Sequence, residues 1–346
     1  MQDNLQLPSL CIVIPTYNEE KFIGKAIRSI LNNGYPLDKI NIYIVDGMSN
    51  DRTVEMAQKL LLNSGVEYNV IKNIDRLPAF GINKVSRIAK EDILVRCDAH
   101  CEYEPDYLFT LINLLLSKKG SKLVAVGGVW RIESGEPNKL IALVVSKVVS
   151  SKWAVGPVDY RQISSDCAPK IVDTAPFTIF WRSDFNSLGG FDVEMAYSED
   201  DELNFRFKKQ GGEVWLHPKA ASTYFARSSV SSLAVQYFRY GQGKARVLRK
   251  YRSTATWRQL VPLFHVIFSV IAILSSILMP YLLLYFIPYF VFLLLAMLDI
   301  KCRRGVRGKI IIPWVIVVVH FSYGFGYLKE LSKVFFEGRH ERKRPD

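Results

Sequence analysis

Short apolar, β-branched runs alternate with longer amphipathic stretches through the first third of the chain. The short runs predict strands at 10–16, 41–47, 66–72, 92–98 and 122–130. The stretches between them have a period near 3.6 residues and predict helices at 19–33, 51–64 and 79–90. Strands that alternate with helices are typical of βαβ units, so we expect an α/β fold with an open, mainly parallel sheet.

Polar residues follow three of these strands, at 16–19, 46–51 and 98–100. Ligands of open α/β sheets bind beyond the carboxyl ends of the strands, so these segments should converge on one crevice. A dinucleotide-dependent oxidoreductase would carry G-x-G-x-x-G after its first strand. This chain has PTYNEE there, which argues against that class.

The last third of the chain is strongly apolar. No charged residue occurs in 259–298 or in 310–328, and both runs are long enough to enter a bilayer. With a turn at Pro280, they divide into segments 260–279, 281–298 and 310–328. Basic residues flank the last segment on both sides, so a third full span would place basic residues outside. The last segment is therefore either a span or a re-entrant or interfacial helix, and the sequence leaves both open.

Charge divides the chain in the same way. Residues 1–225 hold 26 Lys and Arg against 28 Asp and Glu, whereas residues 226–346 carry a net charge of +14. This pattern predicts a soluble domain tethered to an anionic membrane surface. Nucleic acid is not an expected partner, because no nucleic-acid-binding motif accompanies the basic residues.

The domain organisation follows from these divisions. We expect a catalytic domain at 1–225, a basic amphipathic interfacial segment at 226–258, transmembrane or re-entrant helices at 259–330 and a basic tail at 331–346. A hinge is expected at 250–259. No secretory signal is predicted at the start of the chain, so the large domain should be cytoplasmic.

The cysteines do not predict a disulfide framework. They are odd in number, contain no C-x-x-C pair and are Cys11, Cys97, Cys101, Cys167 and Cys302. A zinc site at Cys97, His100 and Cys101 would need a fourth ligand at a matching spacing, and none is nearby. Cys97 and Cys101 are therefore expected to be buried packing residues.

Five ordered segments together resemble glycosyltransferase family 2. They are IVIPTYNEEKFIGKAIRSIL, IVDGMSNDRT, VRCDAHCEYEPDYL, EDDELNFRFKKQGG and QYFRYGQGK. Their spacing and the D-A-H-x-E-Y form are most similar to exopolysaccharide glycosyltransferases of the succinoglycan type. The resemblance covers about residues 10–260 and implies the GT-A fold of nucleotide-diphospho-sugar transferases.

The resemblance assigns the donor nucleotide to Pro15, Tyr17, Glu19 and Asp46. A tyrosine ring can stack on uracil, and a carboxylate can accept a hydrogen bond from the N–H of the uracil ring. From the residues alone, Pro15 and Tyr17 could equally form a strand-ending turn. Asp51 could equally favour the start of a helix.

The D-x-D element of the family corresponds to Asp98 and His100. In the family, these positions hold a divalent ion, Mn²⁺ or Mg²⁺, that bridges the donor diphosphate. Histidine replaces the second acid, and imidazole suits manganese-like ions better than magnesium. His100 is therefore open to three readings: a ligand, a donor that supports the ligands, or a turn residue.

The E-D element of the family places the catalytic base at Asp200, with Asp201 as the alternative. A base of this kind takes the proton from the acceptor hydroxyl as it attacks the anomeric carbon. Four acids in succession would also favour a helix N-terminus through the helix dipole.

The segment QYFRYG resembles the Q-x-x-R-W element, with Tyr240 in place of tryptophan. The resemblance implies that Arg239 binds the departing diphosphate and that Gln236 and Tyr240 contact the acceptor. Eight Lys or Arg and no acid between 227 and 258 also fit an amphipathic interfacial helix.

These expectations combine into a membrane-anchored, inverting glycosyltransferase at the plasma membrane. It would be multi-pass, with a cytoplasmic catalytic domain, and would transfer a hexose from a UDP-sugar to a polyprenyl-diphosphate-linked saccharide. The product would belong to exopolysaccharide or surface-glycan synthesis, and anionic lipids would be further partners. A polyprenyl-phosphate monosaccharide synthase and a non-catalytic membrane scaffold are the alternatives.

Overall fold

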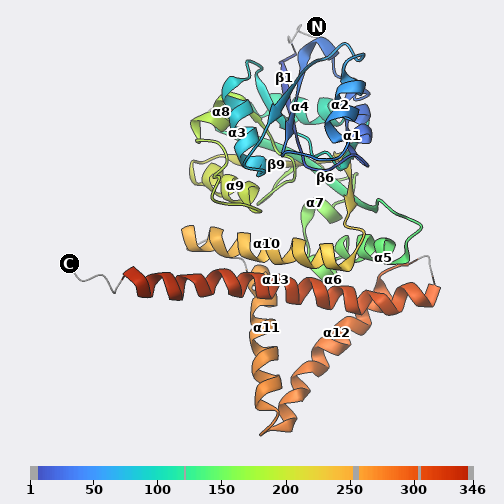
Figure 1. The fold of residues 1–346 in the computed structure, drawn as a ribbon, viewed down its shortest axis with the longest axis vertical. Coiled ribbons are helices and arrows are strands. Elements are labelled where there is room, and N and C mark those ends of the chain that lie inside the picture. The colour runs from blue at the N-terminus through green and yellow to red at the C-terminus, as the bar shows by residue number, and fades with distance from the viewer. Residues whose placement is uncertain (1–6, 121, 252–256, 303–304, 342–346) are drawn as a thin grey trace. The chain divides into compact units, whose positions relative to one another are not determined.

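The computed structural model describes residues 7–120, 122–251, 257–302 and 305–341, with side chains as far as Lys333. The chain forms two compact units (Figure 1). The first consists of Met1–Arg131 and Asp159–Tyr224, and the second of Ile132–Val158 and Phe225–Asp346. Half of the expected hinge at 250–259 and the end of the expected basic tail lie outside the described residues.

The first unit is built on a nine-stranded sheet in the order β3-β2-β1-β4-β8-β6-β9-β5, with β7 paired to β9. The strands are β1 (Leu10–Thr16), β2 (Ile40–Asp46), β3 (Glu67–Lys72), β4 (Ile93–Arg96), β5 (Cys101–Tyr103), β6 (Val124–Ser134), β7 (Lys170–Ile171), β8 (Ile179–Trp181) and β9 (Glu213–Ala226). The α/β fold class is confirmed, and the predicted strands are present at β1 to β4 and β6.

The sheet is mixed in direction. Strands β3, β2, β1 and β4 are parallel, whereas β8 pairs antiparallel with both β4 and β6, and β5 and β7 pair antiparallel with β9. The βαβ pattern therefore describes only the first half of the sheet. In the second half, only β6 was predicted. Strands β5, β7 and β8 are too short to show a pattern, at two or three residues each, and the long strand β9 was missed.

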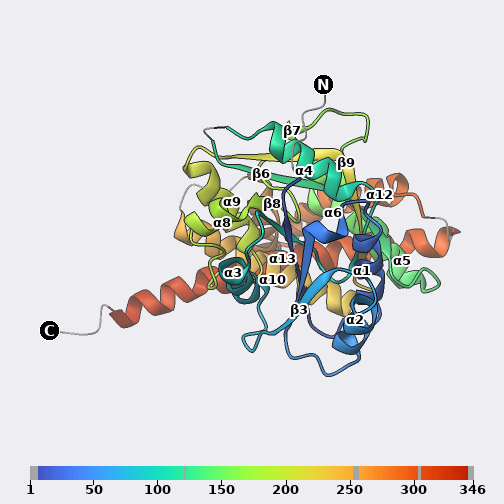
Figure 2. The same cartoon turned by 90° about the horizontal axis from the view of Figure 1, so that it is seen from above.

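Helices cover both faces of the parallel half. The helices of the first unit are α1 (Ile23–Leu31), α2 (Thr53–Leu61), α3 (Pro78–Ile88), α4 (Tyr107–Ser117), α7 (Asp159–Gln162), α8 (Arg182–Ser187) and α9 (Glu199–Lys209). Figure 2 shows α1 and α2 on one side of β1 and α3 with α8 on the other. This is the arrangement that right-handed crossovers require for the strand order 3-2-1-4.

Close packing fixes α3 on the sheet. A Cβ on Gly81 would lie 2.1 Å from Val45 Cγ1, so only glycine permits this approach. The core on this face includes the fully buried rings of Phe185 and Phe207, from α8 and α9. It thereby ties the acidic helix α9 to the strands that carry the candidate site.

The second unit is helical. Its helices are α5 (Leu140–Val149), α6 (Lys152–Val155), α10 (Val230–Lys250), α11 (Trp257–Ser275), α12 (Phe286–Asp299) and α13 (Gly305–Glu341), and the 3-10 turn η2 (Pro280–Tyr285) precedes α12. Within the described residues, three helical segments are long and apolar enough to cross a membrane: Trp257–Ser275, Pro280–Asp299 and Gly305–Lys333. The protein is therefore membrane-associated through this unit.

Candidate active site

The ends of β1 and β2 bring the first predicted segments together. The two strands are parallel and in register up to the pair Thr16 and Asp46. Asp46 is 7% exposed, and the backbone N–H of Ser49 donates to both of its carboxylate oxygens at 3.2 Å. Pro15 fits here because β1 pairs with β4 only as far as Val13, so its missing N–H costs no bond to β4.

Tyr17 follows Thr16 and is the most exposed of the predicted site residues on this edge, at 47%. The guanidinium of Arg76 lies 5.5 Å from the centre of its ring, at a distance typical of a cation–π contact. Arg76 comes from the loop between β3 and α3, and the sequence did not identify it. The exposed part of the ring leaves room for a nucleobase to stack.

His100 lies after β4, and two sets of contacts fix its ring. Its Nδ1 lies 3.2 Å from a carboxylate oxygen of Glu19, from the loop after β1. The edge of the imidazole packs on Tyr224, which is itself stacked on Trp130 with 4.7 Å between the ring centres. The predicted contact of Glu19 with the donor nucleotide stays a prediction, and in the structure the Glu19 carboxylate lies against His100.

Arg96, the last residue of β4, connects the two acidic segments. Its Nε donates to Asp98 at 2.9 Å, and its Nη1 donates to Glu199 at 3.2 Å and to Asp200 at 3.1 Å. The Arg96 side chain is only 11% exposed. One guanidinium therefore brings Asp98 beside the first turn of α9, more than 100 residues later in the chain, and three carboxylates share a single positive charge.

This arrangement perturbs the predicted base. Burial raises the pKa of Asp200, because it removes water from the carboxylate. The nearby Arg96 guanidinium opposes the rise, and repulsion from Glu199, Asp98 and Asp201 adds to it. Together these effects bring the pKa of Asp200 to about 7. The side chain of Asp200 is still 32% exposed. A carboxylate with this pKa and this access is suited to accept a proton near neutral pH.

The start of α9 is fixed from two directions. Glu202 is fully buried and forms a bidentate pair with Arg206, which also donates to the carbonyl oxygens of Leu188 and Gly190. Asn83 of α3 holds the backbone of the same loop at Phe191, with bonds of 2.7 and 2.8 Å. The acids of the first turn therefore have distinct roles, because Glu202 faces the core and Asp200 faces Arg96.

Asp98 and His100 can hold a divalent ion only if a bound substrate supplies the remaining metal ligands. In the part of the chain that the structure describes, no three His, Cys, Asp or Glu side chains form a metal cluster. Asp98 offers a carboxylate, and because His100 Nδ1 lies against Glu19, Nε2 is the ring nitrogen that could bind a metal. Magnesium-type ions commonly take one or two protein ligands together with substrate phosphates. The residues fit a metal that arrives with the donor diphosphate.

Cys97 and Cys101 are almost fully buried, at 0% and 1% exposure. Burial raises the pKa of both thiols well above the ordinary value. They pack beside the site and are poor thiolate ligands.

Gln236, Arg239 and Tyr240 lie together on α10 of the second unit. Gln236 Nε2 donates to the hydroxyl of Tyr240 at 3.0 Å. Their approach to the carboxylates of the first unit stays a prediction.

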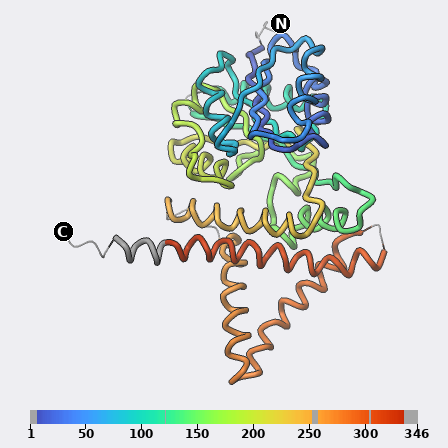
Figure 3. Tube along the Cα trace, in the orientation of Figure 1, coloured from blue at the N-terminus to red at the C-terminus, as the bar shows by residue number. Residues whose placement is uncertain are grey.

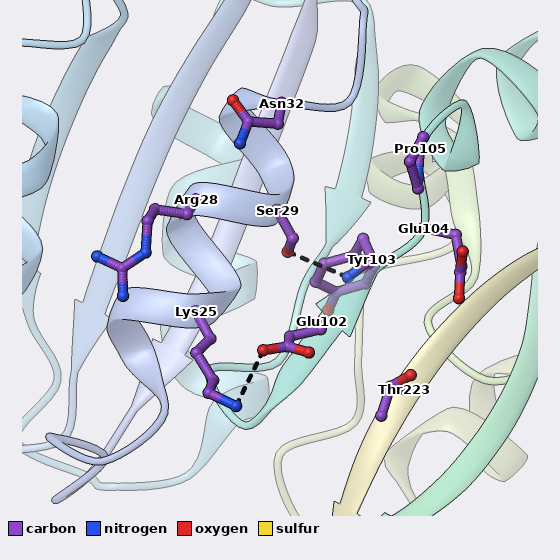
Figure 4. Close-up of a pocket in the computed structure, with 9 residues that line it drawn as sticks. All are labelled: Lys25, Arg28, Ser29, Asn32, Glu102, Tyr103, Glu104, Pro105 and Thr223. Atoms are coloured by element: carbon purple, nitrogen blue, oxygen red, sulfur yellow. Dashed lines mark hydrogen bonds and ion pairs between the residues drawn. The ribbon is translucent and has the colours of Figure 1, made fainter.

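A separate recess lies between α1 and β5 (Figure 4). It has a volume of about 350 Å³. Lys25 pairs with Glu102 across it at 3.2 Å, and the backbone N–H of Tyr103 donates to Ser29. None of the predicted site residues lines this recess.

Arg96 is the main residue that the sequence reasoning missed. It belongs to the stretch VRCDAH, in which the neighbouring acid and histidine were identified. One signal was available: a charged residue at the end of the otherwise apolar strand ILVR needs a buried partner. The identity of that partner required the fold.

The mixed sheet has the GT-A-like arrangement of nucleotide-sugar-dependent transferases, and Asp98 and the predicted base Asp200 lie beside Arg96. The model of glycosyl transferase family 2 matches residues 11–188. The chain belongs to glycosyltransferase family 2 and is an enzyme of that family.

Two curated relatives and one solved structure resemble the chain along most of its length. A dolichyl N-acetyl-α-D-glucosaminyl phosphate 3-β-D-2,3-diacetamido-2,3-dideoxy-β-D-glucuronosyltransferase of Methanococcus voltae is 26% identical over 94% of this chain and 97% of its own length. The succinoglycan biosynthesis protein ExoA of Rhizobium meliloti is 28% identical over 75% and 76%. A mannosyltransferase of Pyrobaculum calidifontis, solved with GDP-Man and Mn²⁺, has a TM-score of 0.58 at 16% identity over 94% of this chain and 88% of that one, which supports the fold.

Proposed function

We propose that the protein is an inverting glycosyltransferase that moves a hexose from a UDP-sugar to a polyprenyl-linked saccharide at the plasma membrane, with its catalytic unit on the cytoplasmic side. The observation that carries this proposal is the Arg96 cluster, in which Asp200 lies beside Asp98 at the carboxyl edge of the parallel strands. Exopolysaccharide or surface-glycan synthesis is the proposed setting, in line with the succinoglycan relative.

In the proposed reaction, the Asp200 carboxylate removes the proton from the acceptor hydroxyl while that oxygen attacks the anomeric carbon. The bond from the anomeric carbon to the diphosphate breaks, and the nucleoside diphosphate leaves. Asp46, Pro15 and Tyr17 bind the nucleotide, and Arg239 binds the departing diphosphate. Arg96 keeps the Asp200 carboxylate in place without touching the substrate.

A divalent ion, when bound at Asp98 and His100, would offset charge that develops on the leaving diphosphate. The solved mannosyltransferase of similar fold contains Mn²⁺. We expect activity to be lost in chelator and restored by Mn²⁺ or Mg²⁺, and His100→Ala to change the preference between the two ions. Initial rates over a metal titration provide the measurement, and full activity in excess chelator would contradict a metal role.

A lipid-linked acceptor is supported by the apolar second unit and by the dolichyl-phosphate-linked acceptor in the name of the Methanococcus voltae relative. Gln236 and Tyr240 are the proposed acceptor contacts. A panel of UDP- and GDP-sugars, offered with bare polyprenyl phosphate and with a saccharide-primed polyprenyl lipid, tests both substrates. Mass analysis should show one added hexose on the primed lipid only. Product on the bare phosphate would instead identify a monosaccharide synthase, and the absence of nucleotide release with every donor would identify a scaffold.

A further inference from the structure

Helices α11 and α12 of the second unit form an apolar hairpin that projects from the helix pair α10 and α13. Figures 1 and 3 show α11 and α12 as two legs that meet at a tip, while α13 runs alongside α10. The tip contains Ile277 and Leu278, which are 82% and 85% exposed. No charged residue occurs between 259 and 298. Exposed apolar surface along two uncharged helices needs a lipid environment.

Close contacts join α13 to α10. A Cβ on Gly241 of α10 would lie 2.1 Å from the carbonyl oxygen of Tyr323, and one on Gly326 of α13 would lie 2.0 Å from that of Phe238. Such close backbone approach is typical of helices that pack through small residues. The two helices therefore lie side by side at the same level.

The charge of α10 limits how deep this helix can lie in a membrane. This helix carries five Lys or Arg and no acid, so it cannot enter hydrocarbon. One of these residues, Arg246, pairs at 3.0 Å with Glu330 of α13, whose side chain is 3% exposed. A helix bound to α10 in this way stays at the membrane surface. With 37 residues, α13 is about 55 Å long, far more than the roughly 30 Å of a bilayer core.

The hairpin of α11 and α12 is too short to cross the bilayer when α10 and α13 lie at the membrane surface. On α11, Leu263 is buried against Tyr327 of α13, and Ile267 packs on the same cluster. On α12, the hydroxyl of Tyr289 already reaches His320 of α13, at 3.1 Å. Only residues 268–288 project beyond these contacts, about ten per leg. At 1.5 Å per residue, each leg extends about 15 Å, which is half of the bilayer core.

We propose that α11 and α12 form a re-entrant hairpin in the acyl-chain region of one leaflet, and that α10 and α13 lie along the surface of the same leaflet. The occupant of the exposed apolar face is the hydrocarbon of an anionic bilayer. Its acyl chains match the uncharged tip, and its headgroups match the basic residues of α10. All described parts outside the hairpin then stay on one side of the membrane. This proposed arrangement is monotopic and differs from the multi-pass arrangement expected from the sequence, which three helices are long and apolar enough to form.

Probe depth tests the position of α13. Single cysteines replace Ile310, Phe325 or Ile277 in a background of Cys167→Ser and Cys302→Ser, and each carries a lipid-sensitive fluorophore. In phosphatidylcholine–phosphatidylglycerol vesicles, shallow and deep spin-labelled lipids report depth by quenching. Ile310 and Phe325 are 64% and 45% exposed and lie 15 residues apart, about 22 Å along the helix. We expect equal shallow depths for these two and a deeper Ile277 probe; depths that differ by about 20 Å would show that α13 spans.

Labelling from each side tests the tip. In oriented vesicles, exposed Cys167 reports the side of the catalytic unit to a membrane-impermeant maleimide, with Cys302 replaced by serine. A cysteine in place of Ile277 should be protected from both sides until detergent is added. Labelling from the side opposite Cys167 would establish a full crossing, and labelling from the Cys167 side would show that the hairpin is not inserted. Either result overturns the proposal.

A charge at the tip gives a readout that needs neither probe nor turnover. Ile277→Lys places a cation in hydrocarbon and should lower the ratio of membrane-bound to free protein by about 100-fold. Ile171→Lys is the matched control, because Ile171 is exposed on the first unit. An unchanged ratio in Ile277→Lys would contradict a tip buried in lipid. These measurements do not depend on the proposed reaction, so the two proposals can fail separately.

Discussion

The two units contain ion clusters of opposite design. In the first unit, the guanidinium of Arg96 is the one cation that binds three carboxylates, at 2.9 to 3.2 Å. In the second unit, the carboxylate of Glu330 is the one anion among three cations, at 3.0 to 3.8 Å, namely Arg246, Arg249 and Lys333. The charge left over is negative in the first cluster and positive in the second.

The net charge of each cluster determines what the cluster can do. Burial and the neighbouring carboxylates raise the pKa of Asp200 to about 7 against the opposing Arg96, so Asp200 is a stronger proton acceptor than an ordinary aspartate. Excess positive charge at Glu330 cannot favour a base, but it joins α10 to α13 and suits an anionic membrane surface. The first cluster is therefore expected to respond to mutation in rate and pH profile, and the second in stability.

The largest expected effect is the loss of the base. Asp200→Asn keeps nearly the same shape but cannot accept the proton, so turnover should fall by about 10²–10⁴-fold, with UDP affinity and folding near wild type. Initial rates and calorimetric UDP binding provide the measurement. Asp201→Asn is the matched control and should lose less. Near-normal turnover in Asp200→Asn with collapse in Asp201→Asn would transfer the role to Asp201.

Removal of the shared cation should come next. Arg96→Gln leaves Asp98, Glu199 and Asp200 without their common partner, which should lower the free energy of unfolding by about 3–5 kcal/mol. Because Arg96 opposes the rise in the pKa of Asp200, the acidic limb of kcat/KM should also move to higher pH. Denaturant melts and pH–rate profiles measure the two effects. A stability loss with an unmoved limb would reduce Arg96 to a purely structural residue.

The second cluster should respond in stability alone. Glu330→Gln removes the negative charge that Arg246, Arg249 and Lys333 share, so the free energy of unfolding should fall by about 1–3 kcal/mol. The pH dependence of kcat/KM should be unchanged, because this cluster has no proposed part in the proton transfer. Denaturation of the detergent-solubilised protein gives the stability, and a shifted pH profile would contradict the separation of the two clusters.

The smallest effect is a shift of the pH profile in a conservative variant. In the wild type, the base must be deprotonated and the pKa of Asp200 is raised to about 7, so kcat/KM should fall about tenfold per pH unit below that value. Glu199→Gln removes one negative neighbour and should move this limb to lower pH by less than about one unit. A limb that moves to higher pH would contradict the proposed repulsion.

Much of the first unit could be predicted from the sequence. The spacing of apolar residues and the polar residues at the strand ends located β1 to β4 and the helices between them, because local patterns decide those elements. The resemblance identified the family and the acids Asp98 and Asp200. It did not identify the contact between His100 and Glu19, because residues about 80 positions apart meet only once the parallel strands are aligned.

The sequence by itself determined the family, the parallel half of the sheet and the presence of long uncharged helices, since each depends on residues close together in the chain. Only the tertiary structure decided that Arg96 joins Asp98 to Asp200, and that α13 packs along α10. Hydropathy is the same for an apolar helix that crosses a bilayer and for one that lies on a neighbouring helix. The choice between them depends on Gly241, Gly326 and Glu330, whose partners lie far away in sequence.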